Sequence, residues 1–199
     1  NFGARNTLYG LASPTYSKKL RMGELIAIGM GYRRSQIHRI GIYARDSSDI
    51  PPKLLNNMKA LYKPYFNAIV KWYENISIGI TGGEIYRIVQ EVLGDYKKFG
   101  VSLNPGHLIH TDEWTNSIFN KNSQSKVTSG MAIQCDMISA ISTKKIGIHI
   151  EDGIIVADRS LRNEIKKLAP GSWDRIVARK EFMKNVLGIN LADEVLPTS

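Results

Sequence analysis

The sequence predicts an α+β fold, a curved antiparallel sheet with two helices on one face. Runs of β-branched and aliphatic residues occur near the start of the chain and again after residue 100. The segment between them carries apolar residues at the 3.6-residue spacing of helices. No low-complexity linker divides the 199 residues, which are enough for one domain with a buried core. We therefore expect a single domain over residues 1–199.

The first expected elements are two paired strands, Glu24–Gly31 and Gln36–Tyr43, joined by a short basic turn. A long helix should follow from Pro51-Pro52, because proline is favoured in the first turn of a helix. Pro64 inside this helix predicts a kink. Its apolar positions follow the helical period: Leu54, Leu55, Met58, Leu61, Tyr62, Tyr65, Ile69, Trp72 and Tyr73.

A second helix should begin at Thr81, because Thr81 and Glu84 have the spacing of a capping box. After Gly100 the pattern returns to strands. We expect four of them: His107–Thr111, Met131–Ser139, Lys145–Glu151 and Gly153–Ala157. A last helix should begin at Ser172 and end at Gly188, and its apolar positions are Val177, Met183, Val186 and Leu187.

Composition limits the function classes. The net charge of +9 arises mainly from residues 1–100, but the basic pairs are scattered and lack interleaved aromatic residues. We therefore expect no nucleic acid as partner. The longest apolar stretch, near residues 25–32, is too short to cross a bilayer, so we expect no membrane partner. The single Cys135 excludes an internal disulfide and a thiolate zinc site, and it favours a cytoplasmic location.

Chemically active residues gather on the later predicted strands. Two histidines and two carboxylates lie within seven residues, behind the Pro105-Gly106 turn: His107, His110, Asp112 and Glu113. Asp136 and Glu151 lie within or just after later apolar runs. His149 precedes Glu151 by two positions, so the alternation of a strand directs both to one face. Histidine titrates near neutral pH and is the commonest metal ligand, so a polar pocket is expected here.

Five short motifs in order resemble the creatinase, aminopeptidase P and methionine aminopeptidase family. They are Leu20-Arg21-Met22-Gly23-Glu24, Ile78-Gly79-Ile80-Thr81, Gly106-His107, Gly130-Met131 and Gly147-x-His149-x-Glu151-Asp152. The resemblance implies the pita-bread form of the α+β fold. It also implies a domain without its opening helix and without any separate N-terminal domain.

The peptidases of this family hold two metal ions with five side chains. Carried over by the resemblance, three of these fall on His107, Asp136 and Glu151, and the two aspartates fall on Gly29 and Gln36. A dinuclear site needs several carboxylates to offset about four positive charges. We therefore expect no metal cofactor. A single divalent ion at His107, Asp136 and Glu151 is the alternative.

The resemblance to creatinase, a member without metal, implies hydrolysis of amide or amidine C–N bonds. His107 and Glu151 are then the core catalytic pair, and His149 or His110 carries the proton. Residues expected at the substrate are His38, His110, Glu113, Trp114 and Asp136. The competing hypothesis is an inactive pita-bread module that binds a peptide or protein partner. We expect a small-molecule or peptide substrate. The sequence does not decide whether the chain forms a homodimer.

Two structural expectations follow. His107, Asp136, His149 and Glu151 should converge on the concave face of one sheet. Without metal ions, Asp136 and Glu151 would repel each other unless a positive group lies between them. We therefore expect His107 or His149 to be hydrogen-bonded to one of these carboxylates and protonated at neutral pH.

Overall fold

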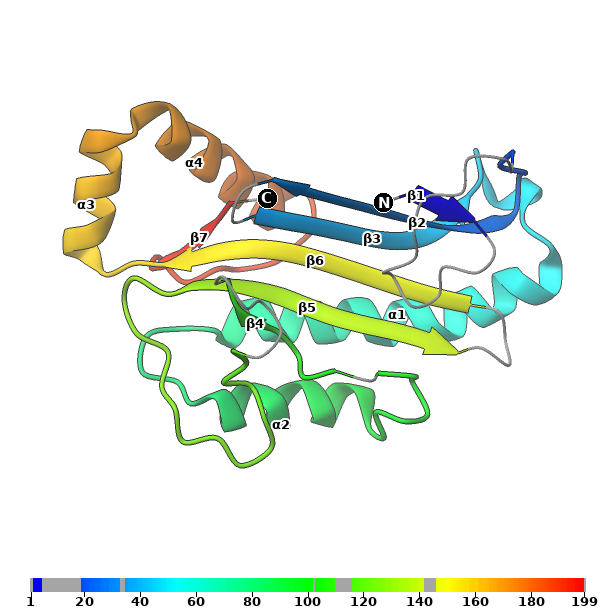
Figure 1. The fold of residues 1–199 in the computed structure, drawn as a ribbon, viewed down its shortest axis with the longest axis horizontal. Helices are drawn as coiled ribbons and strands as arrows, with labels where there is room; N and C mark the ends of the chain where they lie inside the picture. The colour runs from blue at the N-terminus through cyan, green and yellow to red at the C-terminus, as the bar shows by residue number, and fades with distance from the viewer. Residues whose placement is uncertain are drawn as a thin grey trace.

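A computed structural model describes residues 2–4, 19–32, 35–101, 103–109, 116–141 and 146–198. Within these ranges the chain forms four α-helices and one antiparallel sheet of seven strands (Figure 1). The strands are β1 (Phe2–Ala4), β2 (Glu24–Tyr32), β3 (Ser35–Tyr43), β4 (His107–Leu108), β5 (Ala132–Ile141), β6 (Ile146–Val156) and β7 (Val195–Pro197). The α-helices are α1 (Pro52–Asn75), α2 (Gly82–Leu93), α3 (Arg159–Leu168) and α4 (Pro170–Asn185).

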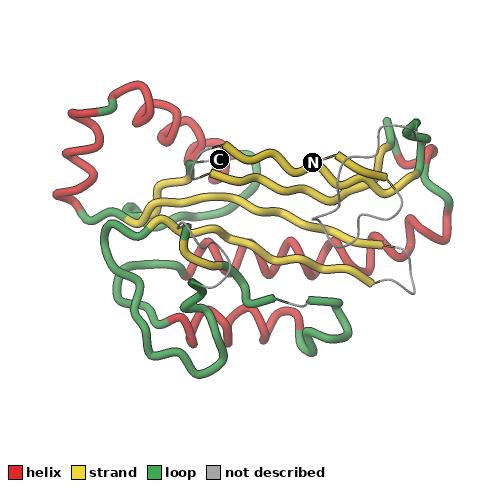
Figure 2. Tube along the Cα trace, in the orientation of Figure 1, coloured by secondary structure: helices red, strands yellow, loops and turns green. Residues whose placement is uncertain are grey.

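The sheet has the strand order β1-β2-β3-β6-β5-β4, and β7 pairs with the far end of β6. The longest strands, β5 and β6, are neighbours and pair from Ala132 opposite Ile155 to Ile141 opposite Ile146. Helices α1 and α2 pack against the same face of this pair (Figure 1). Figure 2 shows α3 and α4 at one end of the sheet, away from α1 and α2. The predicted arrangement of two helices on one face of an antiparallel sheet is therefore confirmed.

Helix α1 begins where the two prolines predict and continues through Pro64. Its buried side chains follow the predicted period: Leu61, Tyr65, Ala68, Ile69, Trp72 and Tyr73. These side chains join residues of β5 and β6 in the main hydrophobic core. Burial of apolar surface on this scale is the main force that holds a helix against a sheet. The predicted amphipathic helix is confirmed.

The capping box of α2 is present. The Thr81 hydroxyl accepts from the backbone N–H of Glu84 at 3.2 Å, and the Glu84 carboxylate accepts from the backbone N–H of Thr81 at 2.8 Å. Gly82 follows directly, and a Cβ atom there would lie 1.9 Å from the carbonyl oxygen of Ile118. Only glycine allows the start of α2 to approach this loop so closely.

Two sequence predictions were wrong in detail. The segments 145–151 and 153–157 were expected as separate strands, but β6 runs unbroken from Ile146 to Val156. Gly153 stays in register opposite Gln134, so this glycine does not interrupt the strand. The prediction also lacked α3, although Asp158 caps it by accepting from the N–H of Leu161 at 2.9 Å.

The last predicted helix exists as α4, but its apolar positions are not all buried. Met183 is buried, whereas the side chain of Val186 is 67% exposed. Ile176 supplies the second buried position.

In the described part of the chain, no helix combines the length and apolar character that crossing a bilayer requires.

Candidate functional site

Strand pairing brings the predicted site residues to one face of the sheet. Asp136 of β5 lies opposite Glu151 of β6, and His107 of β4 lies opposite Gln134, two positions before Asp136. His149 lies two positions before Glu151 on β6, so both side chains share a face. His38 enters from β3, the other neighbour of β6. The predicted convergence on one face is therefore confirmed, and none of the five ionisable side chains is more than 5% exposed.

This face lies opposite the helices. Along β5, Ile133, Cys135 and Met137 pack into the main core with α1 and α2. Asp136 alternates with these residues and therefore points away from the helices. From Ile133 to Met137 the strand therefore has apolar side chains on the helix-covered face and the polar Gln134 and Asp136 on the other, and all five residues are buried.

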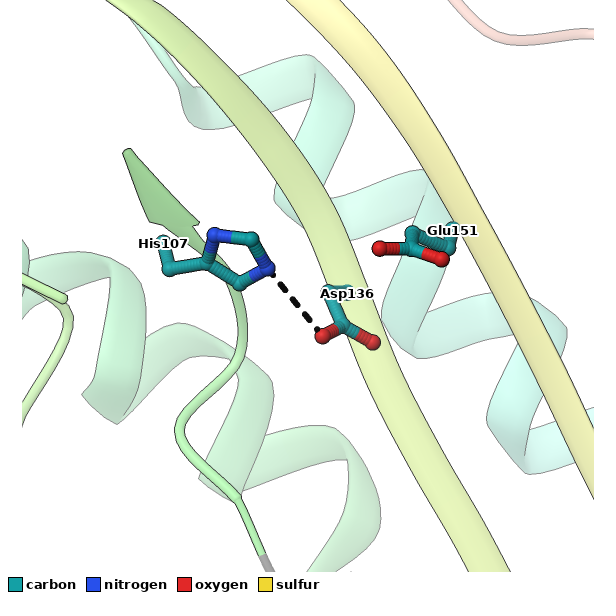
Figure 3. Close-up of side chains that lie close together, drawn as sticks. All are labelled: His107, Asp136 and Glu151. Atoms are coloured by element: carbon teal, nitrogen blue, oxygen red, sulfur yellow. Dashed lines mark ion pairs between the residues drawn. The ribbon is translucent and has the colours of Figure 1, made fainter. Parts of the chain in front are cut away.

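Asp136 is the centre of a hydrogen-bonded network. Its Oδ1 atom lies 2.5 Å from Nε2 of His149. Its Oδ2 atom lies 3.3 Å from Nε2 of His107, and Figure 3 shows this second contact. The other ring nitrogen of His149, Nδ1, contacts Nδ1 of His38. A continuous chain of groups thus runs from His38 through His149 and Asp136 to His107, and it crosses four strands.

The ionisation of Asp136 reflects this network. Burial raises the pKa of its carboxyl, but hydrogen bonds from His107 and His149 and their charges outweigh burial and lower the pKa to about 2. Asp136 is therefore a buried carboxylate at neutral pH. The hydrogen bond expected from a histidine to this carboxylate is confirmed, while the protonation of that histidine stays a prediction.

The orientation of His107 restricts its protonation. Its Nδ1 atom lies 3.0 Å from the carbonyl oxygen of Leu108, which can only accept a hydrogen bond, so Nδ1 carries a hydrogen. Nε2 then faces the carboxylate of Asp136. A neutral ring would direct a lone pair at an anion. This geometry therefore fits an imidazolium, or a cation held between the two side chains.

Glu151 points from β6 toward Asp136 and His107 (Figure 3). Each of the three residues offers one ligand atom, and these atoms lie within 4.8 Å of one another. The set could therefore hold one divalent ion. It does not fit a pair of ions, because Gly29 has no side chain and Gln36 is uncharged at the two positions where the family resemblance puts aspartates. His38, directly opposite Gly29 on the neighbouring strand, brings an imidazole to this part of the sheet instead.

Tyr65 of α1 supports the site from the helix-covered face. Its hydroxyl donates to the carbonyl of Met137 at 2.7 Å and accepts from the N–H of Ile150 at 2.9 Å. Met137 and Ile150 are opposite each other, next to Asp136 and Glu151. Burial raises the pKa of Tyr65 well above its usual range, so the phenol stays neutral. The helical period predicted that Tyr65 is buried, but nothing in the sequence indicated this hydrogen bonding.

Arg39 connects β3 to β6 beside Glu151. Its guanidinium donates to the carbonyl of Glu151 at 2.6 Å and pairs with the carboxylate of Asp152. Arg179 of α4 approaches the same carboxylate at 3.7 Å. The sequence analysis did not identify Arg39. Arg39 directly follows His38 and Asp152 directly follows Glu151, and opposite charges next to two site residues could have indicated this ion pair. Of the other residues predicted at the substrate, His110, Glu113 and Trp114 lie outside the described residues.

The chain resembles a known protein family in sequence. The sequence model of metallopeptidase family M24 matches residues 3–158. No curated protein sequence matches the chain significantly. The family match includes β2 to β6 and the five buried ionisable residues, whereas α3, α4 and β7 lie beyond it.

Solved structures share the fold at low sequence identity. The Xaa-Pro dipeptidase from Bacillus anthracis has 22% identity and a TM-score of 0.58, over 77% of this chain and 42% of its own. Prolidase from Pyrococcus furiosus has 20% identity and a TM-score of 0.57, over 78% and 44%. X-Pro aminopeptidase from Thermotoga maritima has 15% identity and a TM-score of 0.59, over 78% and 43%. These likenesses confirm the predicted pita-bread fold, and this chain spans less than half of each of these proteins.

Proposed function

Because this chain belongs to metallopeptidase family M24, we propose that it hydrolyses amide or amidine C–N bonds without the pair of metal ions typical of the family. The observation that carries the proposal is the buried carboxylate of Asp136, which lies between the ring nitrogens of His107 and His149. Two histidines of the chain therefore offset the charge of this carboxylate.

Hydrolysis of a C–N bond requires a group that takes a proton from water and a group that protonates the leaving nitrogen. His107, held as an imidazolium by Asp136 and the carbonyl of Leu108, is suited to the second task. Glu151 supplies a second carboxylate on the same face and would bind a cationic or N–H group of the substrate. His149 has both ring nitrogens engaged, so its part is to pass protons inside the network.

The substrate class is proposed from the neighbouring structures. Three of them are named as Xaa-Pro dipeptidase, prolidase and X-Pro aminopeptidase. Short Xaa-Pro peptides are therefore the first substrates to test. Small amidines such as creatine are the second, because the sequence resemblance extends to creatinase.

The test is an assay of the 199-residue chain on Xaa-Pro dipeptides and creatine, with and without a metal chelator. We expect hydrolysis that persists in the chelator and is lost in Glu151→Gln and in His107→Gln. Glu91→Gln is the matched control, because Glu91 is an exposed carboxylate of α2 paired with Arg87. Hydrolysis that needs added metal and stops in the chelator would contradict the metal-free part of the proposal.

A second candidate is a module that binds a peptide without cleaving it. The observation that favours it is the internal pairing of Asp136, because both carboxylate oxygens lie against histidines of the same chain. Isothermal titration with the same peptides separates the two candidates. Binding heat without product, measured on folded protein, would favour the module.

We propose no resident cofactor, with one divalent ion at His107, Asp136 and Glu151 as the alternative. A cytoplasmic location and a homodimer stay predictions. Size-exclusion chromatography with light scattering would measure the oligomeric state.

A further inference from the structure

We infer that one side of α4 is a docking surface for an acidic, apolar segment of a partner protein. This surface, the α4 strip, consists of Arg175, Arg179, Phe182 and Val186. Helix α4 carries none of the buried ionisable residues of the candidate site. The inference therefore goes beyond the proposed hydrolysis and does not depend on it.

Helices α3 and α4 form an arm that leaves the sheet at the end of β6 and returns to it at β7 (Figure 1). Strands β6 and β7 are antiparallel neighbours, and at the base of the arm the N–H of Ala157 donates to the carbonyl of Glu194 at 2.8 Å. Two such strands need a loop of only about 2–5 residues, whereas here residues 157–194 connect them. The family match ends at residue 158, before α3 begins. The arm is thus an addition to the sheet, and pairing of β6 with β7 does not require it.

The arm carries many of the exposed apolar side chains. Among the described residues, eleven large apolar side chains are exposed, and five of these lie between residues 168 and 187: Leu168, Val177, Phe182, Val186 and Leu187. Phe182 and Val186 are one helical turn apart and are 47% and 67% exposed, and Leu187 directly follows. Exposed apolar side chains that gather in one place mark an interaction surface, whereas single scattered ones do not.

The residues of the α4 strip lie on one side of the helix, because they are spaced by four, three and four positions. Ile176 and Met183, each one position after a strip residue, are buried. Asp174 and Glu181, each one position before a strip residue, are exposed. One position turns an α-helix by about 100°. The strip therefore lies between the buried side and the acidic side of α4, and it contains no carboxylate.

The arm is also the basic part of the second half of the chain. Residues 159–187 contain eight Lys and Arg against three Asp and Glu. Residues 101–158 and 188–199 together contain four against eight. The positive charge of this half is therefore concentrated on the two helices that also expose apolar side chains.

Few of these cations are neutralised within the chain. In the part that the structure describes, Arg179 is the one of the eight that lies in an ion pair, 3.7 Å from Asp152. Arg39 pairs with the same carboxylate, so two guanidinium groups share one negative charge. Arg175 donates to the hydroxyl of Ser172 at 3.0 Å, which leaves its charge unbalanced. The strip therefore presents positive charge beside apolar surface.

This combination selects the chemistry of the occupant. Guanidinium groups bind carboxylates through paired, charge-assisted hydrogen bonds. Phe182 and Val186 gain free energy when apolar side chains cover them. An amphipathic helix that carries Asp or Glu beside Leu or Phe satisfies both requirements in one binding mode.

Two other occupants fit this surface less well. In a two-fold dimer the same patch of both copies meets, which would bring the arginines of the strip against each other. A helix that lies in a membrane surface buries its apolar side in lipid. That side of α4 is already covered, because Met183 packs in the main core and Ile176 packs against Ala157 and Leu196.

The test is titration of the 199-residue chain with a fluorescein-labelled synthetic peptide that has Leu at helical spacing and Glu at the flanking positions. We expect binding, measured by fluorescence anisotropy, that weakens as the salt concentration rises. Arg175→Glu and Phe182→Ala should each raise the Kd by about tenfold or more. The same peptide with Lys in place of Glu should not bind. In ¹H–¹⁵N spectra of the unmodified protein, the Glu peptide should shift backbone amides of α4.

Lys63→Glu and Phe66→Ala are the matched controls, because they make comparable changes at exposed positions of α1. Both should leave the Kd unchanged. The inference is overturned if the Glu peptide does not bind, if the Lys peptide binds equally well, or if the control variants weaken binding as much as the strip variants. Amide shifts that leave α4 unaffected overturn it as well, and this readout needs no variant.

The other occupants give different results. Phosphatidylserine vesicles that bind the protein more tightly than the Glu peptide does, and lose it in Phe182→Ala, would identify a membrane surface instead. A dimer in light scattering that becomes a monomer in Phe182→Ala would identify a second copy instead. Either result overturns the inference. Failure of the hydrolysis assay does not, because peptide binding is measured without turnover.

Discussion

The two faces of β5 differ in chemistry although both are buried. Ile133, Cys135 and Met137 face α1 and α2 and have no exposed surface. Gln134 and Asp136 alternate with them on the opposite face and are only 1% and 3% exposed. The first face stabilises the fold by removing apolar surface from water, and the second depends on paired polar groups, whose net contribution is small unless one partner is removed. The difference shows that burial alone does not identify the core of this protein.

The largest effect is expected on the helix-covered face. Ile133→Ala should lower the free energy of unfolding by about 2–5 kcal/mol, because it leaves a cavity among fully buried side chains. Denaturant unfolding followed by circular dichroism measures the change. A loss below about 1 kcal/mol would mean that this face is not close-packed.

Tyr65 connects the two faces, because it lies on the apolar side and hydrogen-bonds the backbone beside Asp136 and Glu151. Tyr65→Phe should cost about 1–3 kcal/mol, because a buried carbonyl and a buried N–H lose their partner. Tyr96→Phe is the matched control, since the Tyr96 hydroxyl makes one contact of 3.4 Å with the carbonyl of Tyr86. Equal losses of unfolding free energy in both variants would mean that the Tyr65 hydroxyl does not stabilise the backbone beside the site.

The polar face of β5, through Asp136, should make the stability of the fold depend on pH. The pKa of Asp136 is lowered to about 2 in the folded chain, whereas an unfolded aspartate titrates near 3.9. A lowered pKa stabilises the fold fully above about pH 4, and the contribution is lost as pH falls through 2. The shift corresponds to about 2.6 kcal/mol. Unfolding measured between pH 2 and pH 6 should show this loss in the unmodified protein and not in Asp136→Asn, and parallel curves would contradict the pairing with His107 and His149.

The smallest effect is expected on the solvent-exposed surface. Arg87 and Glu91 form an ion pair on α2 with both side chains 61% exposed. Arg87→Ala should change the free energy of unfolding by no more than about 0.5 kcal/mol. Thermal unfolding at low and high salt measures it. A loss of unfolding free energy as large as that of Tyr65→Phe would mean that exposed polar pairs stabilise this fold as much as buried ones.

Much of the fold could be predicted because local patterns carry it. The period of α1, the capping box of α2 and the alternation of His149 with Glu151 each depend on neighbours in sequence. Helix α3 was also marked locally, by the capping residue Asp158 and by the helical spacing of Leu161, Ile165 and Leu168, but the sequence prediction did not use these signals. The sequence pattern predicts a new strand from Gly153, whereas pairing with Gln134 keeps this glycine within β6.

The sequence predicted the residues of the site and one hydrogen bond from a histidine to a carboxylate, but not the continuous network from His38 to His107. His38 and His149 are 111 positions apart, and their contact depends on β3 pairing with β6 rather than with a strand close in sequence. The hydrogen bonds of Tyr65 and Arg39 likewise depend on which strands meet. Spacing within one strand reveals which face a residue occupies, but not which strand lies beside it.

The most direct test of the metal-free site is elemental analysis of protein purified after growth with added manganese, cobalt and zinc. Gly29 and Gln36 take the places expected for two aspartate ligands, and histidines balance the charge of Asp136. We therefore predict no stoichiometric transition metal. Two equivalents bound to the unmodified protein and lost from Glu151→Gln would contradict it, and so would one equivalent lost in the same way.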